Sequence, residues 1–228
     1  MHPLLKTPSW LTGLGLAALL GTGSPAALAD AAINLTQPGQ VFESAPYTLG
    51  FAFSVSAPLD LLSLGVYDHL GDGLEAAAEV ALWTGVDTTP VRDALVAGGT
   101  AAMLDGGFRY APVAAYRLLP GQTYVVAAYL DGGWATSWGM GEGSLATAAP
   151  QLTVLADRFG DGFFGLSYPG QSDGAGERAF LGANFQLAAV PEPAAALLMT
   201  LGLAALATRR SVFPRVPARW PNRTRDRR

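Results

Sequence analysis

Apolar residues that alternate with small or polar ones, in short runs bounded by glycine and proline, most restrict what this chain can fold into. In Tyr47–Val55 (YTLGFAFSV), Leu49, Phe51, Phe53 and Val55 fall on one face of an extended strand, and smaller residues fall on the other. A period of two residues is typical of a β-strand that has one face in a core. This segment therefore predicts a strand.

Similar runs recur through the central part of the chain. Leu62, Leu64 and Val66 repeat the alternation, and the alanine-rich stretch 73–81 is the one place where a helical turn is expected. Further strands are expected at residues 79–84, 108–113, 123–130, 152–156 and 179–187. Turn-forming sequences separate the runs, among them Ala57-Pro58, Gly71-Asp72-Gly73, Pro120-Gly121 and Asp131-Gly132-Gly133. Many short strands with frequent turns predict an all-β domain over residues 30–189, an antiparallel β-sandwich or jelly roll.

The composition excludes several classes of protein. Half of the 228 residues are hydrophobic and only 14% are charged, which argues against a disordered or nucleic-acid-binding chain. The absence of cysteine excludes disulfides, thiolate metal sites and cysteine nucleophiles. His2 and His69 are the only histidines, so histidine-based catalysis has little material.

The first 29 residues have the pattern of a secretory signal peptide. Lys6 precedes an uncharged apolar run at residues 10–20, and Ala27-Leu28-Ala29 forms a small-x-small cleavage site before Asp30. We expect signal peptidase to cleave after Ala29. The alternative is a buried N-terminal helix.

The C-terminal region has the pattern of a short membrane anchor. Residues 194–208 are uncharged and largely apolar, and Arg209 and Arg210 follow at once. As a helix this segment would span about 22 Å, less than the roughly 30 Å of a bilayer core. The arginines are expected to stay in the cytoplasm, which leaves residues 30–189 on the far side of the inner membrane.

Pro191-Glu192-Pro193 stands directly before that apolar segment. A Pro-Glu-Pro motif, an apolar helix and an arginine cluster, here within residues 190–210, closely resemble the PEP-CTERM sorting domain of Gram-negative surface proteins. The resemblance implies recognition of Pro191, Glu192 and Pro193 by an exosortase, in cells that make exopolysaccharide. The alternative is an ordinary membrane anchor with a chance PEP sequence.

Residues 211–228 extend past the arginine cluster, where members of that family usually end. Three prolines and six arginines in this tail predict a basic, disordered segment. Attraction to anionic lipid and extension past the true stop codon are both open interpretations. By contrast, residues 30–189 hold sixteen acidic residues against five arginines.

The central domain also resembles a group of secreted proteins that carry PEP-CTERM signals. The matching stretches are Leu64-Gly65-Val66-Tyr67-Asp68, Gly71-Asp72-Gly73-Leu74, Glu79-Val80-Ala81-Leu82-Trp83, Gly107-Phe108-Arg109-Tyr110 and Leu119-Pro120-Gly121-Gln122-Thr123-Tyr124. The resemblance implies a β-sandwich and no particular activity.

Asp68, Asp72 and Glu79 stand at positions 1, 5 and 12 of a calcium-loop spacing. Position 3 is Leu70 and supplies no oxygen ligand, and the flanks predict strands, so the segment is not an EF-hand. The spacing recurs at residues 157–162 without a carboxylate at its twelfth position. Two interpretations are open, calcium binding and plain turn formation, since Asp-Gly is common in turns.

Tyr129, Trp134 and Trp138 form an aromatic group beside the carboxylates of Asp131 and Glu142. Exposed aromatic faces next to carboxylates could stack on sugar rings, which makes this group a candidate for glycan contact. The alternative is that these side chains cover the core.

An enzyme is the weakest interpretation. No nucleophile elbow or phosphate-binding loop is found in the sequence, although a pair of carboxylates could hydrolyse a glycoside. We therefore expect a non-catalytic exported protein of the cell surface or extracellular matrix, sorted by an exosortase and associated with exopolysaccharide or biofilm. A carbohydrate- or calcium-binding adhesion module is the first alternative and a polysaccharide-active hydrolase the second. No cofactor other than calcium and no nucleic-acid partner are expected.

Overall fold

The computed structural model describes residues 29–85, 87–138, 145–174 and 178–188. Within these ranges the chain forms antiparallel strands and one short 3-10 turn, η1 (His69–Gly71). The expected all-β class is therefore confirmed for the described residues. The region expected to be a helical turn, 73–81, forms no helix but a bend at residues 75–76 and the start of β6, and η1 precedes it.

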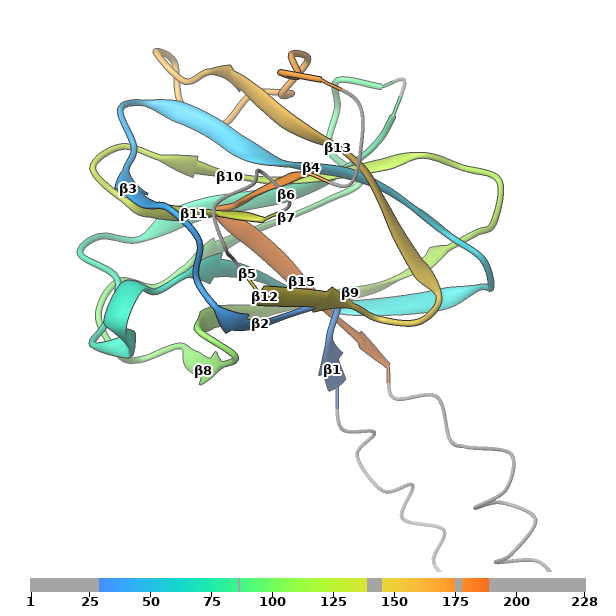
Figure 1. The fold of residues 1–228 in the computed structure, drawn as a ribbon, viewed down its shortest axis with the longest axis horizontal. Coiled ribbons are helices and arrows are strands. Elements are labelled where there is room, and N and C mark those ends of the chain that lie inside the picture. The colour runs from blue at the N-terminus through green and yellow to red at the C-terminus, as the bar shows by residue number, and fades with distance from the viewer. Residues whose placement is uncertain (1–28, 86, 139–144, 175–177, 189–228) are drawn as a thin grey trace, which may run out of the picture.

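Two five-stranded sheets make up most of the domain (Figure 1). The first has the order β1 (Ala29–Ala31), β15 (Ala183–Ala188), β5 (Leu59–Tyr67), β9 (Phe108–Leu118) and β8 (Met103–Asp105). The second has the order β13 (Leu152–Asp161), β4 (Tyr47–Val55), β10 (Tyr124–Leu130), β6 (Ala78–Thr84) and β7 (Arg92–Val96). Two smaller sheets are β14 (Ala179–Leu181), β11 (Trp134–Trp138) and β3 (Val41–Glu43), and β12 (Leu145–Ala148) with β2 (Ile33–Gln37).

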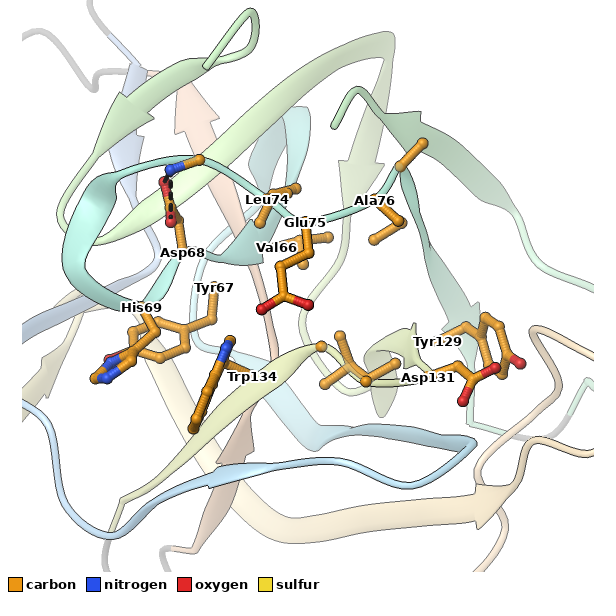
Figure 2. Close-up of a pocket in the computed structure, with 16 residues that line it drawn as sticks. Val66, Tyr67, Asp68, His69, Leu74, Glu75, Ala76, Tyr129, Asp131 and Trp134 are labelled. Carbon is orange, nitrogen blue, oxygen red and sulfur yellow. Dashed lines mark hydrogen bonds between the residues drawn. The ribbon is translucent and has the colours of Figure 1, made fainter. Parts of the chain in front are cut away.

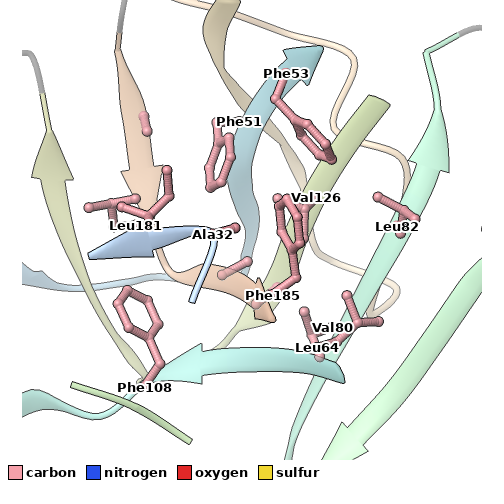
Figure 3. Packing of buried hydrophobic residues seen from close by; sticks show 14 of the residues in the cluster. Ala32, Phe51, Phe53, Leu64, Val80, Leu82, Phe108, Val126, Leu181 and Phe185 are labelled. Carbon is pink, nitrogen blue, oxygen red and sulfur yellow. The ribbon is translucent and has the colours of Figure 1, made fainter. Parts of the chain in front are cut away.

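The two large sheets share one hydrophobic core. The four apolar residues of β4 that the alternation assigned to one face all lie in this core, as predicted. Phe53 of β4 stacks on Phe185 of β15, with ring centroids 4.7 Å apart (Figure 3). Side chains from both sheets thus meet between them, and burial of this apolar surface is the main term that stabilises the fold.

The opposite face of the second sheet is also covered. Ala52, Trp83 and Val125 form a second buried cluster on that face, and Leu166 and Tyr168 pack against it. The Tyr168 ring meets the Trp83 ring edge to face, at a centroid distance of 6.0 Å. The loop after β13 therefore covers this face of the second sheet.

Strand β5 departs from the expected alternation at Leu62. The pairing register shifts between Leu61 and Ser63 against both β9 and β15, so Leu62 is a bulge residue. As a result Leu61 and Leu64 lie in the core, and Leu62 is only half-buried. A bulge adds one residue to one strand and reverses the faces on either side of it.

The expected strand 179–187 is divided into β14 and β15 at Gly182. A Cβ on Gly182 would lie 2.7 Å from Cδ1 of Leu130, so glycine allows the close approach at which the chain passes from one sheet to another. The sequence patterns also missed the short strands β1, β2, β3, β7, β8, β11 and β12.

Both ends of the described domain meet at one sheet edge. Ala29 of β1 is the register partner of Ala188 of β15, and Asp30 pairs with Leu187 (Figure 1). The sorting signal with Pro191, Glu192, Pro193, Arg209 and Arg210 and the tail 211–228 lie outside the described residues, as does the predicted signal peptide 1–29 except for its last residue, Ala29. In the described ranges no helix has the length and apolarity needed to cross a membrane.

Candidate functional site

A pocket of about 290 Å³ lies where the loop between β5 and β6 faces the turn between β10 and β11 (Figure 2). Its lining comes from three stretches, residues 66–69, 73–78 and 129–134. The first two include the loop singled out for its calcium-like spacing, and the third includes two of the three residues singled out for glycan contact. The fold therefore joins two segments that are some sixty residues apart in the sequence.

Aromatic rings form one wall of this pocket. Trp134, at the start of β11, is half-buried, and the His69 ring lies against it with centroids 4.9 Å apart and planes tilted by 37°. The His69 Nδ1 is 3.4 Å from the Tyr67 hydroxyl. Burial raises the pKa of Tyr67, and the neighbouring Asp68 charge raises it further. In Figure 2 the Trp134 ring stands between His69 on one side and Glu75 and Asp131 on the other.

Carboxylates occupy the opposite side. Glu75 and Asp131 are both exposed, and Figure 2 shows the Glu75 carboxylate directed between Trp134 and Asp131. Tyr129 shares a hydrogen bond with Asp131. The pKa of Tyr129 is raised, first by desolvation and then by the Asp131 charge. No lysine or arginine is found among the described residues that line the pocket.

Asp68, which also lines the pocket, is held by Arg109. The Arg109 Nε donates to the Asp68 Oδ2 over 2.6 Å, and both Asp68 carboxylate oxygens accept from the Gly73 amide at 3.2 Å. Arg109 uses its other donors on the carbonyls of Gly71, Thr100 and Ala102. The Asp68 carboxylate thus already has an internal cation as its partner.

Asp68, Asp72 and Glu79 are not brought together as a ligand set. Asp68 is buried, whereas Asp72 caps η1 at the surface and Glu79 is exposed on β6. Over the described part of the chain, no group of three or more histidine, aspartate or glutamate side chains could hold a metal ion. The geometry favours the turn interpretation of this loop, and calcium binding stays a prediction.

The second calcium-like spacing lies in β13 rather than in a loop. Asp157 is fully buried and accepts from the Ser172 hydroxyl at 2.6 Å and from the Asp173 amide at 3.3 Å. Through these two hydrogen bonds the Asp157 carboxylate holds the segment around Ser172 and Asp173 against β13.

The three aromatic candidates are divided between two environments. Tyr129 and Trp134 line the pocket and Trp138 does not, but both tryptophans are half-buried and pack against the core. Packing against the core is what the alternative expected of both tryptophans, and glycan contact stays a prediction. Glu142 lies outside the described residues.

Glu75 is the pocket residue that the sequence analysis missed. It lies in a bend within the stretch where a helical turn was expected, directly after Leu74, which pairs with Gly99. The amides of Leu74 and Gly99 each donate to the other's carbonyl, at 3.2 and 2.7 Å. The sequence feature that could have indicated Glu75 is a glutamate that follows the Gly71-Asp72-Gly73 turn. The direction of the Glu75 side chain, however, depends on the distant pairing of Leu74 with Gly99.

Comparison with known proteins adds no family to this description. The chain matches no protein-family model, and no curated protein has a significantly similar sequence.

Proposed function

We propose that this chain is a non-catalytic exported protein of the cell surface or extracellular matrix that binds exopolysaccharide through the pocket beside Trp134. One observation carries the proposal: a half-buried tryptophan ring and two exposed carboxylates, Glu75 and Asp131, face the same small cavity. Its volume of about 290 Å³ is at the lower end of small-molecule pockets, and it suits one sugar unit of a longer chain. Such a protein is an adhesion or matrix component.

The sequence patterns at both ends support the route to this location. Signal peptidase would release the chain after Ala29, and the segment 190–210 would hold it in the inner membrane until an exosortase processes it. The protein would then reach the surface or matrix of a Gram-negative bacterium. The pairing of Asp30, the first residue after the cleavage site, with Leu187 is compatible with this route, because both ends of the exported domain then lie at one sheet edge.

The arrangement of the two large sheets supports the finer fold proposal. Two antiparallel sheets with a shared core are the architecture of a β-sandwich. We propose that the exported domain is such a sandwich and that the pocket opens between its connecting loops, where many sandwich domains carry their binding sites.

The use of His69 supports a binding role rather than catalysis. Its ring lies tilted against Trp134 and its Nδ1 lies 3.4 Å from the Tyr67 hydroxyl, so it is part of an aromatic wall. A polysaccharide-active hydrolase is the alternative, and it predicts new reducing ends when the exported protein is incubated with polysaccharide. The proposal predicts retention without new ends.

The binding claim is tested by the retention of the exported protein on the native exopolysaccharide. Trp134→Ala is expected to abolish retention, because the sugar-facing ring is lost. Leu95→Ala is the matched control, since Leu95 is an exposed apolar residue on β7 that does not line the pocket. Equal retention of the two variants, both with unchanged melting temperature, would exclude the pocket as the binding site.

The sorting claim needs a separate experiment. Mass spectrometry of the C-terminus, from cells with and without the exosortase, is expected to show loss of the residues after the Pro191-Glu192-Pro193 region only when the enzyme is present. Intact Arg228 in both samples would contradict exosortase sorting.

A further inference from the structure

The pocket carries negative charge that no neighbouring cation neutralises. Figure 2 shows the exposed Glu75 carboxylate pointing into the pocket and the exposed Asp131 carboxylate at its far end beside Tyr129, and no described lining residue is lysine or arginine. The buried Arg109 donates to Asp68 and to three backbone carbonyls, so it offers no charge to a ligand. The whole domain adds to this field, with sixteen acidic residues against five arginines between residues 30 and 189.

The half-buried Trp134 ring lines the pocket. His69 lies against the indole on one side, and Figure 2 shows the Glu75 carboxylate on the other. The face of an indole attracts cations through its quadrupole. An ammonium group that lies between such a face and a carboxylate is therefore attracted by the ring and by the carboxylate at once. A tryptophan beside two carboxylates is therefore complementary to a positively charged amine.

The remaining lining suits the body of a sugar. The Tyr129 hydroxyl shares its hydrogen bond with Asp131, so its oxygen can accept from a sugar hydroxyl. Val66, Leu74 and the alanines 76–78 provide apolar surface for the C–H face of a ring. Sugar rings combine such an apolar face with hydroxyl groups at their edges.

We propose that the pocket selects an amino sugar with a free, protonated amine, such as a glucosamine unit, over N-acetylated and acidic sugars. This inference rests on the proposed function, because it names the ligand class of the same pocket. N-acetylation removes the charge that Glu75 and Asp131 would pair with. A uronate would bring a further carboxylate to a site that already holds the exposed carboxylates of Glu75 and Asp131.

Calorimetry of the exported protein with three probes tests the selection. The probes are hexamers of glucosamine, of N-acetylglucosamine and of galacturonic acid, at mildly acidic pH where the amine is protonated. We expect the glucosamine hexamer to bind at least about tenfold more tightly than the N-acetylated hexamer, and the galacturonate hexamer not to bind. Glu75→Gln and Asp131→Asn are each expected to remove most of this preference.

Asp93→Asn is the matched control for charge. Asp93 is an exposed carboxylate on β7 outside the pocket, so its replacement changes the net charge equally. If this control weakens glucosamine binding as much as the pocket variants do, the amine is attracted by the net charge of the domain and not by the pocket carboxylates. The inference is then wrong.

The outcomes separate this inference from the proposed function. Equal affinity for glucosamine and N-acetylglucosamine, with both lost in Trp134→Ala, would overturn the charge selection and leave exopolysaccharide binding intact. Retention on native exopolysaccharide without binding of the glucosamine hexamer would also overturn it. Failure to bind both the hexamers and the native polysaccharide would overturn the proposed function itself.

Discussion

The Arg109 guanidinium donates from Nε to Oδ2 of Asp68 over 2.6 Å, and the two side chains are only 4% and 1% exposed. The other guanidinium donors end on carbonyls of the η1 turn and of the connection before β8. This one buried pair therefore joins the end of β5 to β9 and to two loops. It also fixes the start of the loop that carries His69 and Glu75, on which the pocket depends.

Loss of one partner of this pair is expected to be costly. Asp68→Asn leaves the Arg109 charge buried without its counterion and should lower the free energy of unfolding by about 3–5 kcal/mol. Asp60→Asn is the matched control, because Asp60 and Arg117 also form a carboxylate–guanidinium pair, at 2.7 Å. That pair lies at the surface, and its Asp60 and Arg117 side chains are 39% and 57% exposed. That control should cost about 1 kcal/mol or less.

Chemical denaturation of the three proteins checks this expectation. The double variant Asp68→Asn/Arg109→Met, which removes both charges, should recover part of the loss. Similar losses for Asp68→Asn and Asp60→Asn would show that the buried pair has no special role.

Calcium is expected to leave the melting temperature unchanged. The Asp68 carboxylate is engaged by Arg109 and by the Gly73 amide, and Asp72 and Glu79 do not converge on it. A calcium ion would have to displace a charge-assisted hydrogen bond to reach it. Thermal melts with calcium and with a chelator test this, and a rise with calcium that Asp68→Asn abolishes would restore the calcium hypothesis.

The core strands could be predicted from the sequence because their burial is a property of each strand alone. In β4 the face that holds Phe51 and Phe53 points to the core, as the alternation requires. The failure at Leu62 has a different origin, since a bulge depends on how β5 pairs with both neighbours. In strand β7 the apolar residues are consecutive, with Val96 in the core and Leu95 64% exposed, so they give no alternation by which the strand could be recognised.

The pocket could be predicted only in parts. Trp134 and the Asp68 loop were each singled out from local composition, but their meeting follows from the sheet order, in which β5 and β10 belong to different sheets. Glu75 was missed because a distant pairing, Leu74 with Gly99, sets the direction of its loop. Local patterns carry no information on contacts of this kind.

Two buried tyrosines should respond in opposite ways to loss of the hydroxyl. The Tyr110 hydroxyl has no hydrogen-bond partner among the described residues, so Tyr110→Phe should leave the stability unchanged or raise it by up to about 1 kcal/mol. The Tyr124 hydroxyl accepts from the Leu119 amide at 2.9 Å and donates to the Gln122 side chain at 2.8 Å. Tyr124→Phe should therefore cost about 1 kcal/mol.

Urea titration of both variants against the native chain measures this difference. Equal destabilisation by the two changes would mean that Tyr110 has a partner in solution.

The domain should lose stability above about pH 10. Burial raises the pKa of Tyr67, Tyr110 and Tyr124 above the ordinary value of 10.0, with the Asp105 charge adding to the effect at Tyr110. The unfolded chain then releases these protons at lower pH than the folded one, so stability that is present below pH 10 falls as the pH rises through it. Denaturation at about pH 9 and about pH 11 measures the loss. Tyr110→Phe should reduce it, and an unchanged loss in that variant would contradict this assignment.

Leu70 has a backbone conformation that few leucines adopt. Its φ of 69° and ψ of −11° place it at the third position of a turn that the Gly71 amide closes on the Asp68 carbonyl at 3.2 Å. Type II turns favour glycine or asparagine there, because a side chain with a β-carbon is crowded at positive φ. The leucine side chain is 82% exposed, so its burial offsets little of this cost.

Leu70→Asn should therefore raise the free energy of unfolding by about 0.5–1 kcal/mol, and the β-branched Leu70→Val should lower it by about 1 kcal/mol or more. Thermal and chemical denaturation measure both changes. Because Leu70 does not line the pocket, Leu70→Asn should retain the native exopolysaccharide as the unchanged protein does. Loss of retention in a variant that is more stable would instead show that the exposed leucine itself contacts the polysaccharide, and that the binding surface extends beyond the pocket.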